Sequence, residues 1–408
     1  MSSSRSIALP HRRSSRSRHF SAGWLAAACW LIGQAAVAQN VDDDASGIAA
    51  RAVASALSGS GGESLDELSA ESYDAIARDL AARIGTIERN QGHVTREIIA
   101  PMTELANLHI SANQCESAVP LLEDVLRLIR QLDGVLNAGQ LPIYEPLLEC
   151  FAARERLQDL KRAQDQVLLI KENAYGRNGE RMIPALVHAG GWYEEAGDYE
   201  SARDAHSRAL TLARKLGGEQ DIRLIEPLRG LARTFRLQMQ FESEPWRGRA
   251  LDGQAQRMLE RAARIARASA SIDSKLKVDT LLELGDSYQV TGAVRDAAKI
   301  YREVWNAGGR AMLSEPEPVF YHAAVGTALR RAPLVRDKLK HYWIDFEFTV
   351  TRDGGVEDVE VRDASAPKHL RADLADNIRR TPFRPRFADG EPVDTHGVSI
   401  RQGMWVEQ

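Results

Sequence analysis

The chain has 408 residues, of which 44% are hydrophobic and 27% charged. This length suggests two or three domains with cores of their own, and the composition excludes a collagen-like, wholly disordered or polytopic membrane protein. Beyond residue 38, 48 basic side chains face 57 acidic ones, a formal charge of −9, which argues against a nucleic acid as the main partner because phosphate binding needs clustered Lys and Arg.

The amino terminus has the three parts of a secretory signal peptide. Five arginines and no acid lie in residues 1–38, an apolar run covers residues 22–38, and the run ends in the small-residue triplet Ala36-Val37-Ala38. We therefore expect residues 1–38 to be removed after Ala38 and the mature chain to be exported. The alternative is an uncleaved membrane anchor, although a run of 17 residues is short for a span that needs about 20.

The next stretch is a leader that precedes the first helix. Residues 39–63 are small, polar and Gly/Ser-rich, as in a flexible linker, and residues 65–89 have the apolar spacing of a helix. Only Cys115 and Cys150 remain after cleavage. An oxidising compartment permits a disulfide between them, but both fall on predicted helices where a buried small apolar residue would also fit. The pairing is left open.

From about residue 95 the chain repeats itself. Each of four predicted helices opens with a proline, which the first helical turn tolerates, at intervals of 45, 38 and 43 residues: Pro101, Pro146, Pro184 and Pro227. A second helix follows each one and carries a small residue at the same phase: Ala118, Ala163, Ala202 and Ala255. A repeat of this period indicates stacked helical hairpins.

The clearest unit covers residues 281–304. We expect Gly285 of its first helix to face Ala297 of its second, with Gly292 between the helices, because small residues let two helices cross closely. The pattern resembles the tetratricopeptide repeat in a longer variant of about 42 residues, with five units over residues 95–309 and an insertion near 240–253 in the fourth. The resemblance implies an α-solenoid, a right-handed superhelix that binds proteins and has no chemistry of its own. An irregular all-α domain is the alternative.

The tetratricopeptide resemblance also implies a binding surface. If the groove geometry of the family applies, the first helices line the concave face of the superhelix, and the two clearer repeats place these residues there: Val187, Gly191, Glu194, Asp279, Leu282, Asp286 and Gln289. The Lys/Asn set with which similar repeats clamp a terminal carboxylate is missing. Basic or extended partners are therefore favoured, with a solvated acidic face as the alternative.

Past residue 309 the helical period ends. A last helix over residues 320–331 is expected to cap the array, and from residue 343 the apolar period becomes two: Ile344, Phe346, Phe348 and Val350. This predicts a strand, a turn at residues 352–355 and a return strand at 356–362 with Val359 and Val361 on one face. A helix over residues 367–380, capped by Ser365, and a strand region over 393–406 follow.

This order of elements resembles the carboxy-terminal domain of TonB, the energy transducer of Gram-negative envelopes. The match covers residues 332–408 and is carried by Phe346 to Val350, Asp353-Gly354, Val356 to Val359, Phe383, Pro385, Gly390, Pro392 and Val393. An unrelated small α+β module is the alternative.

The TonB resemblance implies that the last strand lies at a sheet edge. There an extended peptide, such as the front segment of an outer-membrane receptor, is added as a further strand. The edge would be residues 393–406, and the peptide-binding residues would be Val393, Val398, Ser399, Ile400, Met404 and Trp405.

The sequence contains no familiar catalytic motif: no HExxH, no Gly-rich phosphate loop, no CxxC and no GxSxG. We therefore expect no enzyme, no metal and no cofactor. The prediction is a mainly α protein with a helical repeat domain at residues 64–331 and a small α+β domain at 332–408. It would act as an adaptor for protein partners in the periplasm of a Gram-negative bacterium. The alternative is a TonB-type energy transducer for outer-membrane transport, anchored in the inner membrane.

Overall fold

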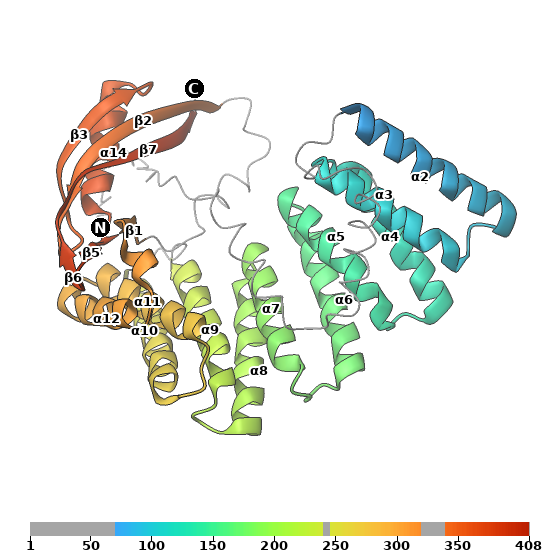
Figure 1. The fold of residues 1–408 in the computed structure, drawn as a ribbon, viewed down its shortest axis with the longest axis horizontal. Coiled ribbons are helices and arrows are strands. Elements are labelled where there is room, and N and C mark those ends of the chain that lie inside the picture. The colour runs from blue at the N-terminus through green and yellow to red at the C-terminus, as the bar shows by residue number, and fades with distance from the viewer. Residues whose placement is uncertain (1–69, 240–244, 320–338, 408) are drawn as a thin grey trace, which may run out of the picture.

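A computed structural model describes residues 70–239, 245–319 and 339–407. They form an arc of paired helices that carries a small sheet and one further helix at its carboxyl end (Figure 1). The predicted mainly α fold with a small α+β part is confirmed. The predicted signal peptide, leader and capping helix lie outside the described residues. Within the described ranges, no helix is long and apolar enough to cross a membrane.

Among the described residues, helix α2 (Ala70–Gln91) precedes five helical hairpins, which correspond to the five predicted repeats. The first three hairpins are α3 (Ile99–Ser111) with α4 (Cys115–Asp133), α5 (Leu141–Ala153) with α6 (Leu157–Tyr175), and α7 (Met182–Glu195) with α8 (Tyr199–Gly217). The last two are α9 (Ile225–Met239) with α10 (Pro245–Ala268), and α11 (Ser274–Val290) with α12 (Val294–Asn306). Four short 3-10 turns complete the array: η2 (Arg96–Ile98), η3 (Ala138–Gln140), η4 (Ile222–Leu224) and η5 (Arg310–Leu313).

Small residues hold the hairpins together, as the repeat pattern predicts. The four alanines at the same phase of the second helices are all buried: Ala118, Ala163, Ala202 and Ala255. Gly197 and Gly292 turn the chain between the two helices of the third and fifth hairpins at φ +69° and +78°, a conformation that glycine adopts without strain. Apolar side chains fill the space between neighbouring helices along the whole array.

One predicted helix start is wrong. Pro101, Pro184 and Pro227 are the third residues of α3, α7 and α9, whereas Pro146 is the sixth residue of α5. Pro142 takes the early position in α5. The repeat spacing pointed to the second of two prolines, although either could fit the first turn.

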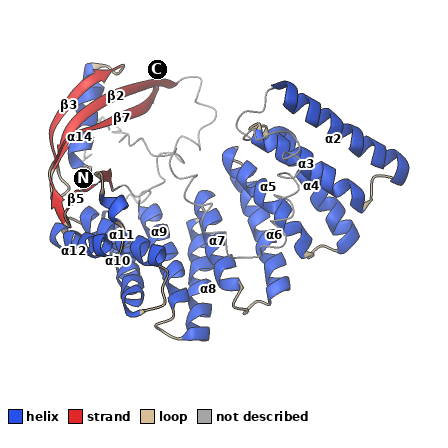
Figure 2. Cartoon of the chain, viewed as in Figure 1, coloured by secondary structure: helices blue, strands red, loops and turns tan. Residues whose placement is uncertain are grey.

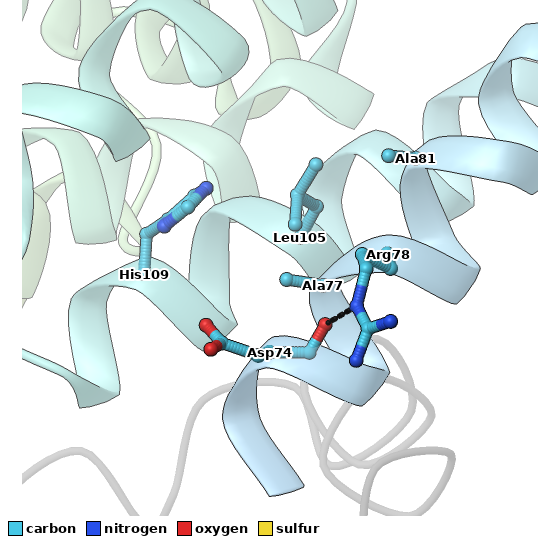
Figure 3. Close-up of a pocket in the computed structure, with 6 residues that line it drawn as sticks. All are labelled: Asp74, Ala77, Arg78, Ala81, Leu105 and His109. Atoms are coloured by element: carbon cyan, nitrogen blue, oxygen red, sulfur yellow. Dashed lines mark hydrogen bonds between the residues drawn. The ribbon is translucent and has the colours of Figure 1, made fainter. Parts of the chain in front are cut away.

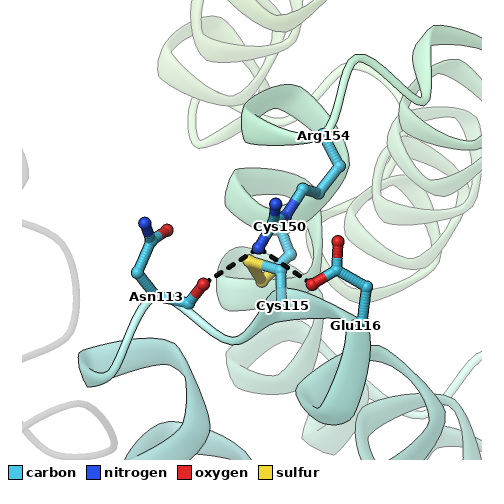
Figure 4. The surroundings of a disulfide bond; sticks show 5 residues. All are labelled: Asn113, Cys115, Glu116, Cys150 and Arg154. Atoms are coloured by element: carbon cyan, nitrogen blue, oxygen red, sulfur yellow. Dashed lines mark hydrogen bonds and ion pairs between the residues drawn. A yellow bond between two sulfur atoms is a disulfide. The ribbon is translucent and has the colours of Figure 1, made fainter.

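A disulfide ties the first hairpin to the second (Figure 4). Cys115 is the first residue of α4, Cys150 lies in the last turn of α5, and their Cα atoms are 5.4 Å apart. Both cysteines are buried. Beside them, Arg154 donates to the Asn113 carbonyl at 2.9 Å and pairs with Glu116 at 2.9 Å. The pairing that the sequence leaves open is therefore made.

The carboxyl-terminal part is a three-stranded antiparallel sheet in the order β3-β2-β7 (Figure 2). β2 (Leu339–Val350) lies between β3 (Val356–Ala364) and β7 (Thr395–Glu407), and α14 (Lys368–Arg380) packs against the sheet. The alternate residues of β2 are buried against α14, as predicted: Ile344, Phe346, Phe348 and Val350. Two short pairs complete it: β1 (Glu317–Pro318) with β4 (Phe383–Arg384), and β5 (Arg386–Ala388) with β6 (Glu391–Val393).

Two side-chain predictions in this part are wrong. Ser365 does not cap α14, because its hydroxyl accepts a hydrogen bond from the Trp343 amide at 2.8 Å. Val359 packs against the core, but Val361 is 38% exposed. The register of β3 shifts around Asp358, which has a φ of +53°, so the simple alternation does not hold along this strand.

Candidate functional site

The last strand, β7, lies at the edge of the sheet, as predicted. Among the described strands it pairs with β2 alone, in a register that joins Phe346 to Ile400 and Phe348 to Val398. One correction concerns Val393, which belongs to β6 and pairs with Arg386. Asp394 follows it and accepts a hydrogen bond from the Arg352 amide at 2.6 Å, which separates β6 from β7. The edge therefore begins after residue 394.

The contacts of β2 reveal which backbone groups of β7 point away from the sheet. In an antiparallel strand the N–H and C=O of one residue point to one side, and those of the next residue to the other. The Trp343 amide donates to the Ser365 hydroxyl at 2.8 Å, its carbonyl accepts from the Ser365 amide at 3.0 Å, and the Thr351 amide donates to the Gly355 carbonyl at 2.9 Å. The backbone N–H and C=O groups of the odd-numbered residues of β2 thus point toward β3.

The backbone N–H and C=O groups of the even-numbered residues of β2 must therefore point toward β7. Their partners Val398 and Ile400 direct their own N–H and C=O groups back to β2. Ser399 and Arg401, which lie between and beyond them, direct theirs to the outside of the sheet. These outward groups constitute the open edge of β7, which an added strand could pair with.

The side chains of β7 alternate between core and solvent. Val398 and Ile400 are half-buried against the core beneath α14, whereas Ser399 is exposed. Arg401 forms a two-pronged ion pair with Asp345 at 2.6 and 2.7 Å and lies 4.5 Å from the centre of the Trp343 ring. Two further predicted residues are also in β7: Met404 is paired with Tyr342, and Trp405 with His341.

The second predicted surface lies on the first helices of the hairpins, and its residues differ widely in surroundings. Val187 and Leu282 pack partly into the array core. Gly191 has open space beside it, since a Cβ added there would meet no described atom within 4 Å. Glu194 is 7% exposed and Gln289 is 5% exposed, so neither offers a freely solvated side chain.

Glu194 joins the third hairpin to the fourth. It accepts hydrogen bonds from the Arg233 guanidinium and the Thr234 hydroxyl, both at 2.5 Å, and lies 3.3 Å from the His206 ring. Burial alone would raise the pKa of Glu194, but Arg233 and the hydrogen-bond donors outweigh burial and lower it. Glu194 is therefore an ionised residue inside the array.

A second ion pair continues across the first helices from α9 to α11. The guanidinium of Arg229 donates to both carboxylate oxygens of Glu283, at 2.6 and 3.1 Å. Asp279, one helical turn before Glu283, is half-buried, and its burial raises the pKa of its carboxyl. This part of the surface is held together by charges of the chain itself.

The remaining two predicted residues contact the carboxyl-terminal part. Arg384 lies against Asp286 at 2.7 and 3.0 Å and against Glu317 at 2.6 Å. The Gln289 amide donates to the Asp353 carbonyl at 2.6 Å. We call this set of contacts the clasp. Sequence reasoning missed Arg384, because nothing local to it indicates a carboxylate nearly a hundred residues earlier in the chain.

The closest packing in the fifth hairpin also differs from the prediction. A Cβ on Gly285 would meet the Tyr301 ring at 2.5 Å, so Gly285 faces Tyr301 rather than Ala297. The Tyr301 hydroxyl donates to Asp286 at 2.8 Å. Burial and the Asp286 charge raise the pKa of Tyr301 well above its usual value. Gly285 thus makes room for an aromatic ring that supports the clasp.

One hollow among the described residues is shallow. It has a volume of about 440 Å³ and lies between α2 and α3, where Asp74 and Arg78 lie opposite Leu105 and His109 (Figure 3). The Arg78 side chain is turned back onto the Asp74 carbonyl at 3.0 Å. Within the described ranges, no group of three His, Cys, Asp or Glu side chains could hold a metal ion.

Comparison with known proteins identifies the helical repeat. A sequence model of the tetratricopeptide repeat matches residues 181–243, which include α7, α8 and α9. No curated protein matches the chain.

Two similar solved structures are repeat proteins. One holds the nearly identical TPR-like repeats of a Podosopora anserina protein that carries the name kinesin light chain; it is 17% identical, covers 49% of this chain and 90% of its own, and has a TM-score of 0.40. The other, BtubC (BKLC) from P. vanneervenii, is 17% identical, covers 59% of this chain and 89% of its own, and has a TM-score of 0.39. The sequence match and the fold together indicate a scaffold for protein partners.

Proposed function

We propose that the protein is a non-catalytic adaptor of the Gram-negative periplasm, which binds protein partners on its repeat array and an extended peptide on its carboxyl-terminal sheet. The open edge of β7 is the single observation that supports peptide binding on the sheet. Edge strands with unpaired backbone groups bind extended segments by adding a strand. The edge position of the last strand is what the TonB-like pattern requires, and the front segment of an outer-membrane receptor would be such a partner.

Two features support an exported protein. The amino terminus has the pattern of a signal peptide, and the described part of the chain contains a buried disulfide, which persists in oxidising compartments. The TonB-type transducer would instead keep residues 22–38 as an anchor. The adaptor requires only that the array and the sheet bind their partners.

A proline at position 399 tests the peptide-binding edge. Ser399→Pro removes an outward N–H and leaves the pairing of Val398 and Ile400 with β2 in place, so the sheet should fold while a peptide loses a hydrogen bond. We expect binding of a short labelled peptide of alternating Val and Thr to weaken by about tenfold, since one such bond contributes about 0.5–1.5 kcal/mol and the ring also obstructs the edge.

Two variants are the controls for this experiment. Ser399→Thr keeps the N–H and should bind like the wild type, and Ile400→Pro should unfold the sheet because its N–H points to β2. Wild-type affinity in a folded Ser399→Pro protein would show that peptides do not pair with this edge. Fluorescence anisotropy measures the affinity, and circular dichroism checks the fold.

A further inference from the structure

The carboxyl-terminal sheet is held against the last hairpin by more than the clasp. Phe387 is 3% exposed and belongs to the apolar core of the array, with its ring 6.1 Å from Tyr301 and 6.3 Å from Trp305. Arg302 of α12 pairs with Glu391 at 2.6 Å. An aromatic anchor and two separate ion-pair sites define one orientation of the sheet relative to the array.

In that orientation the open edge of β7 faces the inside of the arc. Figure 1 shows β3 on the outer side of the sheet, β2 in the middle and β7 on the side toward the centre of the arc. Helices α5 and α7 are on the inner side of the same arc, with α6 and α8 on the outer side. A peptide on β7 would therefore have one flank directed into the arc.

The inner side of the arc keeps exposed carboxylates toward its amino-terminal end, where Glu145 lies beside His188 and is also acted on by the charge of Lys171. Between α7 and the sheet, carboxylates and guanidiniums of the chain neutralise one another through the pairs Glu194–Arg233, Arg229–Glu283 and Asp286–Arg384. Further toward the amino terminus, Glu145 and Glu149 of α5 are both exposed. The open space beside Gly191 of α7 belongs to this stretch. We call Glu145, Glu149, His188, Gly191 and Trp192 the notch.

The chemistry of the notch favours a cationic side chain. His188 lies 3.5 Å from Glu145 and packs edge-on against Trp192, with their ring centres 6.1 Å apart. Partial desolvation, together with the charge of Glu145, raises the pKa of Glu149, so a partner cation would relieve an unfavourable charge. Carboxylates beside a half-buried indole are a suitable site for Lys or Arg, and the missing side chain at Gly191 leaves room for it.

We propose that a single polypeptide occupies both surfaces: a strand-forming segment pairs with the open edge of β7, and a flanking Lys/Arg-rich segment lies in the notch. The proposal rests on the proposed function of the β7 edge. Because the clasp and Phe387 hold the two surfaces at a set separation, binding at one makes binding at the other intramolecular, and the two affinities reinforce each other without any new contact.

Three labelled peptides test the proposal on the mature protein. The first is the Val/Thr strand block alone, the second joins this block through a Gly/Ser linker to a block of lysines, and the third replaces the lysines by glutamates. We expect the lysine peptide to bind at least tenfold more tightly than the strand block, with an optimum linker length, and the glutamate peptide to show no gain. Equal affinities of the lysine peptide and the strand block at every linker length would overturn the proposal.

Substitutions at Gly191 then test the notch without changing the β7 edge. Gly191→Leu should abolish the gain from the lysines while the strand block binds as before, and Gly191→Ala should keep most of the gain. A Cβ at position 191 meets no described atom within 4 Å and both residues favour a helix, so both proteins should fold. A gain that persists in Gly191→Leu would place the lysines elsewhere and refute the notch.

Variants that weaken the contacts between the sheet and the array test whether the fixed separation of the β7 edge and the notch matters. Arg384→Met and Gln289→Met should each reduce the gain from the lysines without changing the affinity of the strand block, and at least one of these two is expected to fold. An undiminished gain in a folded variant would show that the orientation of the sheet is irrelevant. If the strand block binds wild type and folded Ser399→Pro equally, the proposed function fails together with this inference; if only the lysine gain is absent, the proposed function stands.

Discussion

Gly191 and Gly285 lie on the first helices of two hairpins, yet their surroundings are opposite. A Cβ on Gly191 would meet no described atom within 4 Å, whereas a Cβ on Gly285 would be 2.5 Å from the Tyr301 ring. Tyr301 is buried and cannot easily move, because it packs against Phe387 and its hydroxyl is bound to Asp286. The absent side chain serves an internal contact at one position and leaves a surface open at the other.

This contrast predicts opposite effects of the same substitution. Gly285→Ala should lower the free energy of unfolding by about 1–3 kcal/mol, because it overpacks the contact with Tyr301. Gly191→Ala should leave that free energy unchanged or raise it by up to about 1 kcal/mol, because alanine favours a helix. Denaturant titration measures both, and equal effects of the two substitutions would contradict the assigned packing.

At the scale of the element, the disulfide adds a covalent link between two hairpins that otherwise contact each other by packing, hydrogen bonds and an ion pair. It joins the start of α4 to the end of α5 across 35 residues of chain. Each hairpin of a solenoid is stabilised mainly by its neighbours, so a covalent link near the amino-terminal end restrains the part of the array that has the fewest neighbours.

Replacement of both cysteines by alanine should lower the free energy of unfolding by about 2–4 kcal/mol, because the unfolded chain is no longer cross-linked. The loss is expected in non-reducing buffer. A reducing agent should destabilise the wild type to the same extent and leave the double variant unaffected. Wild-type stability that does not respond to a reducing agent would mean that the cysteines are not paired in the folded protein.

At the scale of the whole molecule, the sheet completes the core of the array. Phe387 comes from β5, but its ring packs among Tyr301 and Trp305 of α12. A solenoid that ended at α12 would expose apolar side chains at its last hairpin, and terminal units of such arrays need a cover. The sheet supplies part of that cover.

Phe387→Ala should therefore destabilise the array as well as the sheet. We expect a loss of about 3–5 kcal/mol, as for other buried aromatic truncations, and increased amide hydrogen exchange in both α12 and β2. Leu169→Ala is the matched control, because Leu169 is 44% exposed and its truncation should cost far less. Exchange that rises in the sheet alone would show that the two parts fold independently.

The sequence by itself determined the elements and their order. Helix periodicity and the small residues at Ala118, Ala163, Ala202 and Ala255 predicted the hairpins, and the alternation from Ile344 to Val350 predicted the central strand, because such patterns depend on residues a few positions apart. Its local errors were the start of α5, where Pro142 takes the early position instead of Pro146, and the cap of α14, where the Ser365 hydroxyl is bound to the Trp343 amide of a distant strand. The edge position of β7 followed from a family resemblance.

Only the tertiary structure decided what the predicted surface residues do. Asp286 is bound by Arg384, 98 residues further along the chain, and Glu194 by Thr234, 40 residues further. The outward direction of the Ser399 amide depends on how β2 pairs with β3, and the disulfide depends on how two hairpins stack. No local pattern encodes these contacts, since they arise when distant segments pack and their charges and backbone groups find partners.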